Sequence, residues 1–136
     1  MMLSKRILLA YDGSDESVRA LEHAAELAMA LKAEIGVVSV VPIHAGRIGL
    51  DPWDDRKIHS DELMDARTRL LESGLTPTLY EPAGAVAEEI IRTASEGKYD
   101  HIVLGSRHGN LAQRILQGSV SESVAIRTTV TITIVH

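Results

Sequence analysis

The segment from Gly105 to Ser121 combines glycines, hydroxyl groups and a cation in a spacing suited to holding an anion. Glycine allows backbone N–H groups to approach a bound group closely. Gly118-Ser119 stands where a helix is expected to begin, and the free N–H groups and dipole of a helix N-terminus favour phosphate. Ser119 and Ser121 add hydroxyl donors, and Arg107 adds a positive charge. A structural alternative stays open, in which the glycines serve turns and a helix cap and Arg107 is solvated.

Two common phosphate-binding motifs are missing from the sequence. A Walker loop requires a lysine after its second glycine, whereas Ser119 follows Gly118. The pair Gly97-Lys98 is followed by Tyr99 and has no glycine at the required upstream position. No G-x-G-x-x-G sequence occurs, so the dinucleotide-binding fingerprint is absent as well.

The first half of the chain predicts two buried strands, each followed by a helix. Unbroken apolar runs at Ile7–Ala10 and Ile35–Val41 are typical of strands buried on both faces, and Pro42 is expected to close the second. Ser14 or Asp15 can cap the first helix. Between the second strand and the second helix, residues 44–55 contain two glycines, one proline and a cluster of acidic residues, and they are predicted to form a long surface loop. The second helix is marked by Leu63, Ala66, Leu70 and Leu71 and stops at Gly74.

The second half continues the alternation of strands and helices. Thr76–Tyr80 is predicted to be an edge strand because Pro77 lies near its start. A helix is expected from Gly84, a buried strand over His101–Leu104, a helix over Ser119–Ile126 and a last strand over Thr129–Val135. This order predicts an α/β fold, a doubly wound five-stranded parallel sheet with helices on both faces. Such sheets bind ligands at the carboxyl ends of their strands, which places a site between Tyr11–Asp15 and Gly105–Asn110.

Composition narrows the class of protein. The chain has 136 residues, which fits one domain, and it contains no cysteine, so disulfides and thiolate metal sites are excluded. A net charge of −5 without a run of Lys or Arg argues against binding to nucleic acid. No apolar stretch reaches the length needed to span a bilayer. The six histidines show no metal-ligand spacing. We therefore expect a cytoplasmic protein with no nucleic-acid, membrane or structural metal partner.

At several positions the sequence resembles the universal stress proteins. ATP-binding members of that family carry Gly-x2-Gly-x9-Gly-Ser/Thr after the fourth strand, and here Gly105 and Gly118-Ser119 match its two ends. The middle glycine is replaced by His108, with Gly109 one place later. The resemblance also covers residues 7–14, 84–91 and 102–107, so it extends over nearly the whole chain apart from residues 44–55.

The resemblance implies that the protein binds ATP, with Mg²⁺ held through the phosphates. By this similarity Asp12 contacts the ribose end, Ala10 lines the same pocket, and Val40 meets the adenine through its backbone. The residues expected around the phosphates are Gly105, Gly109, Gly118, Ser119 and Val120. The sequence itself supports Asp12, because a carboxylate at a strand end can accept hydrogen bonds from ribose hydroxyls. A turn-forming role ahead of Gly13 explains Asp12 equally well.

The altered motif leads to a specific hypothesis about His108. If the loop is shifted by one residue, Gly109 supplies the close approach to phosphate and His108 lies at the rim, where it can donate to a phosphate oxygen. ATP affinity would then rise as the pH falls from about 8 to 6, around the reference pKa of histidine. In the opposite case the imidazole obstructs the pocket or points away from it.

The expected function is that of a stress-response regulatory protein that binds ATP. No general base is evident beside the phosphate loop, so ATP hydrolysis is expected to be slow at most. The alternating strand Thr129–Val135 suits a sheet edge, and in the family this strand commonly builds a homodimer. Two alternatives stay open. One is a dimeric adaptor that has lost nucleotide binding, and the other is an enzyme related to ATP pyrophosphatases, which residues 12–17 faintly resemble.

Overall fold

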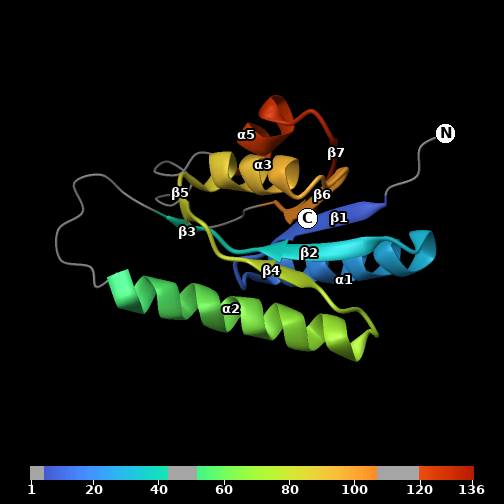
Figure 1. Ribbon diagram of the computed structural model, residues 1–136, viewed down its shortest axis with the longest axis horizontal. Coiled ribbons are helices and arrows are strands. Elements are labelled where there is room, and N and C mark those ends of the chain that lie inside the picture. The colour runs from blue at the N-terminus through green and yellow to red at the C-terminus, as the bar shows by residue number, and fades with distance from the viewer. Residues whose placement is uncertain (1–4, 43–51, 107–119) are drawn as a thin grey trace.

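A five-stranded parallel sheet forms the centre of the protein (Figure 1). The computed structural model describes residues 5–42, 52–106 and 120–136. The strands follow the order β4-β2-β1-β6-β7, so the chain first builds outward on one side of β1 and then on the other. The strands are β1 (Arg6–Ala10), β2 (Glu34–Val38), β4 (Thr78–Tyr80), β6 (His101–Gly105) and β7 (Thr131–Val135). The predicted α/β fold is confirmed.

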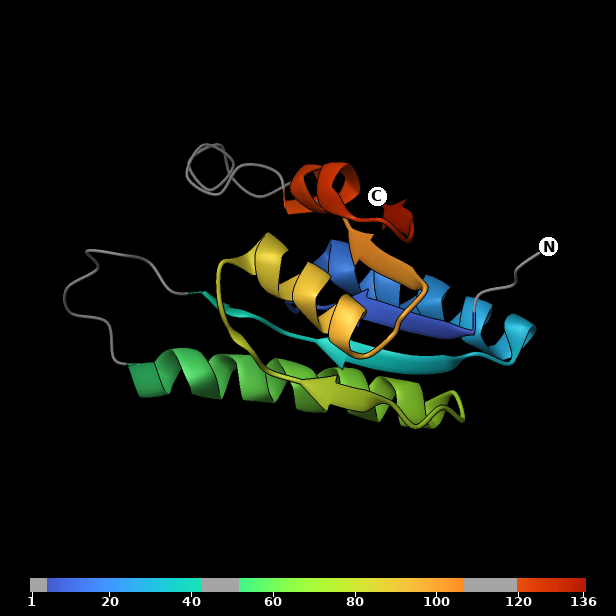
Figure 2. The same ribbon diagram turned by 45° about the horizontal axis from the view of Figure 1, so that its top comes forward.

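Helices cover both faces of this sheet (Figure 2). On one face α1 (Asp15–Leu31) and α2 (Pro52–Glu72) pack against side chains such as Ile7 and Leu9 of β1. On the other face α3 (Val86–Glu96) and α5 (Val120–Arg127) pack against Leu8 and its neighbours. Because successive side chains of a strand point to opposite faces, a strand buried on both sides has to be apolar throughout. This explains the unbroken apolar runs in the sequence.

Local sequence signals fix the ends of the first helix. Ser14 is its N-cap and accepts a hydrogen bond from the backbone N–H of Ser17, as its predicted capping role requires. At the other end Lys32 takes a left-handed conformation and its backbone N–H bonds to the carbonyl of Ala28. Gly74, the predicted stop of the second helix, also has a positive φ of 84° just beyond α2.

The predicted second strand is wrong in its length. It ends at Val38, and β3 (Val41–Pro42) pairs instead with β5 (Ala83–Gly84) in a separate two-stranded sheet. The chain keeps its hydrogen bonding across this break, because the N–H of Ser39 bonds to the Tyr80 carbonyl at 3.0 Å. Pro42 does not close the second strand, which has already ended at Val38, but is the second residue of β3. A proline without an N–H is tolerated in such a short peripheral pair.

Further element boundaries differ from the sequence-based prediction. Strand β4 begins at Thr78 and not at Thr76, β7 begins at Thr131 and not at Thr129, and the starts of two helices differ as well. Helix α2 begins at Pro52, so residues 52–55 are helical and do not belong to a loop. Proline suits the first turn of a helix because its missing N–H would have no partner there. Residues 44–51 of the predicted loop lie outside the described residues. Helix α3 begins at Val86 with Ala85 as its N-cap, whereas Gly84 belongs to β5.

Polar groups join the amino ends of the central strands. The Asp100 carboxylate, just before β6, accepts from the backbone N–H of Lys5 at 2.9 Å and of Arg6 at 3.3 Å. The Arg6 side chain donates to the Gly97 carbonyl, forms an ion pair with Glu34 and lies 4.6 Å above the centre of the Tyr99 ring.

In the described part of the chain, no helix is long and apolar enough to cross a membrane.

Candidate functional site

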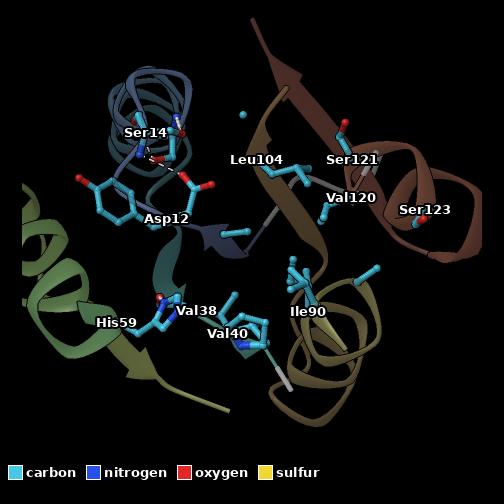
Figure 3. A pocket seen from close by; sticks show the side chains of 18 of the residues that line it. Asp12, Ser14, Val38, Val40, His59, Ile90, Leu104, Val120, Ser121 and Ser123 are labelled. Atoms are coloured by element: carbon cyan, nitrogen blue, oxygen red, sulfur yellow. Dashed lines mark hydrogen bonds between the residues drawn. The ribbon is translucent and has the colours of Figure 1, made fainter. Parts of the chain in front are cut away.

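A cavity of about 360 Å³ opens at the carboxyl ends of β1, β2 and β6. This volume falls within the range of small-molecule binding sites. The cavity lies where the chain turns from one side of β1 to the other, which is the usual ligand position in open parallel sheets. The residues that define its walls in Figure 3 are Asp12, Ser14, Val38, Val40, His59, Ile90, Leu104, Val120, Ser121 and Ser123.

Every predicted site residue that the structure describes lines this cavity. They come from four separate parts of the sequence, namely the end of β1, the segment after β2, the end of β6 and the start of α5, and they are Ala10, Asp12, Val40, Gly105, Val120 and Ser121. The remaining predicted site residues lie outside the described residues: Arg107, His108, Gly109, Gly118 and Ser119. The hypothesis of a loop shifted by one residue at His108 therefore stays a prediction.

Asp12 forms the predicted turn and also lines the cavity. Its Oδ1 atom accepts a hydrogen bond from the backbone N–H of Ser14 at 3.0 Å, which forms the turn leading into α1. The same residue lines the cavity, as Figure 3 shows. Gly13 follows with a positive φ of 79°, a conformation that side chains rarely adopt. The turn thus holds the carboxylate in place at the cavity wall.

Gly105 has a structural reason to be glycine. A Cβ atom added there would lie 2.7 Å from the backbone carbon of Glu16 and 2.8 Å from its carbonyl oxygen. These atoms belong to the first turn of α1, which therefore approaches the end of β6 more closely than any side chain would allow. Gly105 also borders the cavity, so close helix packing and the shape of the pocket depend on the same missing side chain.

The cavity has a third wall that the sequence-based prediction missed. It is formed by His59 of α2, one of the six histidines for which the sequence showed no metal-ligand spacing. The His59 Nδ1 atom lies 2.9 Å from the Ser39 Oγ atom and 3.0 Å from the Glu62 Oε2 atom, and Ser39 donates to the same Oε2 at 3.1 Å. The available signal was the His-x-x-Glu spacing, which places both side chains on one face of a helix.

Burial raises the pKa of Glu62, and the nearby Asp12 carboxylate adds to this effect. The His59 imidazole and the hydrogen bonds from Ser39 and His59 act in the opposite direction.

No Lys or Arg occurs among the described residues that line the cavity. Within the described parts of the chain, no group of three or more His, Cys, Asp or Glu side chains could hold a metal ion.

Comparison with known proteins assigns the chain to a family. A sequence model of the universal stress protein family matches residues 4–136. The chain belongs to the universal stress protein family. Universal stress protein Rv1636 of Mycobacterium tuberculosis is 30% identical over 145 residues, covering 100% of this chain and 99% of the relative. Universal stress protein MJ0531 of Methanocaldococcus jannaschii is 32% identical over 130 residues, covering 90% of this chain and 76% of the relative.

Solved universal stress protein structures share this fold. A universal stress protein crystallised in complex with cAMP is 26% identical, covers 99% of each chain and superposes with a TM-score of 0.76. The crystal structure of Rv1636 is 28% identical, covers 100% of this chain and 98% of the other, and gives a TM-score of 0.64. The predicted resemblance to this family is therefore confirmed.

Proposed function

We propose that the cavity binds an adenine nucleotide, ATP together with Mg²⁺, and that the protein acts as a stress-response regulator. The observation that carries this proposal is the unequal chemistry of the two opposite walls. On one side stand hydrogen-bond acceptors from Asp12 and the α2 wall, and on the other side α5 begins (Figure 3). A nucleotide has the matching asymmetry, with hydrogen-bond donors on its nucleoside and negative charge on its phosphates.

The α5 wall is suited to the phosphate end. Helix α5 starts at Val120, so the positive end of its dipole lies beside the cavity. The hydroxyl-bearing Ser121 and Ser123 line the same side. The segment that contains Gly118-Ser119 leads directly into this helix, and we assign Gly105, Arg107, His108, Gly109, Gly118 and Ser119 to the phosphate region as well.

The nucleoside end then lies over the ends of β1 and β2. We assign Asp12 to the ribose hydroxyls, Val40 to the adenine through its backbone, and Ala10 to the pocket floor. The relative crystallised with cAMP supports an adenine nucleotide, because it is 26% identical and covers 99% of this chain. Mg²⁺ would be held through the phosphates, since the described residues provide no cluster of metal ligands.

We propose that ATP is a bound signal that is hydrolysed slowly at most. The one imidazole among the described lining residues, His59, stands on the wall opposite α5 and away from the proposed phosphates. It is therefore not placed to activate a water molecule for attack on a phosphate. An enzyme of the ATP pyrophosphatase type remains the less favoured alternative on the same ground.

Calorimetry with ATP and Mg²⁺ tests the proposed function directly. We expect binding in the micromolar range, and Asp12→Asn should weaken it about ten-fold or more, because hydrogen bonds to a charged group contribute about 1.5–3 kcal/mol. Asparagine keeps the Oδ1 acceptor for Ser14, so the turn is preserved. Ser119→Ala should have a similar effect at the phosphate end. Glu22→Gln, an exposed change on α1, is the control.

Two results would count against the proposal. Failure of the parent protein to bind ATP, combined with no nucleotide in the mass spectrum of ligand released from freshly purified protein, would favour the dimeric adaptor. Production of AMP and pyrophosphate during turnover would instead favour the enzyme. Unchanged affinity in the Asp12→Asn variant would remove Asp12 from the site while leaving nucleotide binding intact.

We also propose a cytoplasmic homodimer paired through residues 129–135, with no nucleic-acid or membrane partner. Strand β7 is the last strand of the sheet and pairs with β6 alone within the described structure. Ile132→Pro removes an N–H group and inserts a ring into this strand, so it should shift a dimer toward monomer. Light scattering on the parent protein checks the idea, and a monomeric parent would refute it.

A further inference from the structure

A hydrogen-bonded triangle of three side chains stands at the α2 side of the cavity, and two of them, Ser39 and His59, line it. Ser39 follows β2 and is itself 1% exposed, while His59 and Glu62 lie one turn apart on α2. The three contacting atoms are 2.9, 3.0 and 3.1 Å apart. Figure 3 shows the His59 ring reaching from α2 toward Val38 and Val40, which border the same cavity. The triangle therefore fixes the position of an imidazole at the cavity wall.

Counting protons assigns the tautomer of this imidazole. The Ser39 hydroxyl donates its one proton to Glu62 Oε2. With the Glu62 carboxylate ionised, the contact of 3.0 Å between His59 Nδ1 and Glu62 Oε2 is attractive only if Nδ1 carries a proton. A proton on Nδ1 is also compatible with the contact of 2.9 Å to the Ser39 oxygen. In a neutral imidazole the other nitrogen, Nε2, is then a hydrogen-bond acceptor.

The Nε2 atom is accessible from the cavity side of the helix. It makes no hydrogen bond with any residue that the structure describes, whereas Nδ1 makes two. Every buried side-chain nitrogen or oxygen in the described regions has a partner, so Nε2 is not a buried atom. The His59 side chain is 17% exposed and lines the cavity, which leaves Nε2 as the accessible polar atom of this ring.

We propose that His59, positioned by Ser39 and Glu62, is a specificity-determining residue that accepts a hydrogen bond through Nε2 from a donor on the nucleoside part of the ligand. The inference rests on the proposed function and adds a recognition role for α2. The donor is either the 6-amino group of adenine or a ribose hydroxyl, and both present the same chemistry to Nε2.

Charge on this wall supports a neutral donor as the partner. The Asp12 and Glu62 carboxylates are close enough that Asp12 raises the pKa of Glu62. A phosphate would be repelled by two carboxylates and would meet an acceptor at Nε2. Amino and hydroxyl groups carry no charge and can donate to Asp12 and to His59, which both line the cavity, so the nucleoside fits this wall and the phosphates fit the α5 side.

The variant His59→Asn separates the two nitrogens of the imidazole. The asparagine amide can occupy the place of Nδ1 and keep contacts with Ser39 and Glu62, but it has no group at the position of Nε2. Ile58→Asn is the matched control, because Ile58 is the preceding residue of α2, is 54% exposed and does not line the cavity. Thermal unfolding of both variants establishes that they are folded before binding is measured.

Binding is measured by calorimetry with four ligands, each with Mg²⁺: ATP, purine riboside triphosphate without the 6-amino group, 2′-deoxy-ATP and 3′-deoxy-ATP. His59→Asn should weaken ATP binding about three- to ten-fold, the effect of losing one neutral hydrogen bond. For the analogue that lacks the donor, His59→Asn should change affinity less than two-fold. The identity of that analogue shows whether the amino group or a hydroxyl is recognised. Ile58→Asn should leave all four affinities unchanged.

The possible failures are distinguishable. An equal loss for all four ligands would mean that His59 only shapes the wall, and an unchanged affinity for ATP would mean that Nε2 faces no ligand group. Either result overturns the inference while nucleotide binding stands. If the parent protein binds none of the four ligands, the proposed function fails and the inference fails with it.

Discussion

Polar side chains have different surroundings at the two ends of the parallel sheet. At the amino end, the Asp100 carboxylate and the Arg6 guanidinium form hydrogen bonds and an ion pair with other residues of the chain. At the carboxyl end, Asp12 and His59 also have partners in the chain, but both face a cavity of about 360 Å³. The same kinds of side chain thus join strand ends at the amino end and line a cavity at the carboxyl end.

The difference separates positions that stabilise the fold from positions that can bind. Parallel strands bring their carboxyl ends to one edge, where the turns into the helices spread apart on either side of β1. Among the described residues, the charged groups at the amino end do not line this cavity, and their bonds join the ends of the strands to one another. Substitutions at the amino end should therefore change stability alone, and substitutions at the carboxyl end should change ligand affinity.

The largest expected effect is at the amino end, for Tyr99→Ala. Tyr99 is 3% exposed, packs edge-on against Tyr80 and lies so close to Gly36 that a Cβ atom there would be 2.2 Å from its hydroxyl. Removing this ring should lower the free energy of unfolding by about 3–5 kcal/mol. Urea denaturation monitored by circular dichroism measures the loss.

A milder change at the same residue tests whether the amino end is independent of the cavity. Tyr99→Phe removes the hydrogen bond of 2.8 Å to the Tyr80 hydroxyl and should cost about 1 kcal/mol. Nucleotide affinity of this folded variant should equal that of the parent. A clear loss of affinity would show that the two ends are coupled and that the comparison does not hold.

Gly105→Ala should have the next largest effect, and it should change both properties at once. The added methyl group meets the backbone of Glu16, so α1 has to shift, which should cost about 1–3 kcal/mol. Because Gly105 borders the cavity, affinity should fall as well. Gly74→Ala is the matched control, since it costs roughly 1 kcal/mol through its positive φ but meets no atom within 4 Å. Stability loss without affinity loss in Gly105→Ala would assign this glycine to packing alone.

Hydrophobic periodicity and turn residues predicted most of the fold, because buried parallel strands and capped helices have characteristic local sequence patterns. The run Ile7–Ala10 and the cap at Ser14 were predicted correctly. The break after Val38 was not, since the hydrogen bonds of Ser39 depend on Tyr80, about forty positions later. A local pattern contains no information about such a partner.

Prediction of the candidate site from the sequence is limited in the same way, because contacts between distant segments leave no local sequence pattern. The described predicted residues follow strand ends or begin α5, where the fold class alone places ligands, and they do line one cavity. His59 was missed because its role depends on how α2 lies against the end of β2. The spacing of His59 and Glu62 shows that they share a helix face, but it does not show that Ser39 meets them there.

The pH dependence of stability should differ between the two ends, and His101 dominates at the amino end. This residue is buried, bonds through Nε2 to the Thr133 hydroxyl at 2.7 Å and faces Asp100 and His23. Burial lowers the pKa of His101, His23 lowers it further and Asp100 opposes them. The folded state therefore disfavours the charged form, and stability should fall as the pH drops below about 6.5, the reference value. In urea denaturation from pH 7 to 5, His101→Gln should flatten this dependence, and an unchanged slope would refute the assignment.

The smallest expected effect is the opposite dependence at the carboxyl end, from Glu62. Burial raises the pKa of Glu62 from its ordinary value of 4.5, with Asp12 adding to the rise while His59 and Ser39 oppose it. A raised pKa means that the folded state holds the proton more tightly than the unfolded chain does. The resulting stabilisation is fully present below the ordinary value and is lost as the pH rises through the pKa of the folded state. Glu62→Gln, which stays neutral at every pH, should lose this dependence, so the stability of the variant relative to the parent should rise with pH across that window. Glu22→Gln on the exposed side of α1 is the control, and urea denaturation of ligand-free protein is the measurement. If the relative stability of Glu62→Gln falls with pH instead, the hydrogen bonds from His59 and Ser39 outweigh burial, and the α2 wall is internally satisfied in the same way as the amino end.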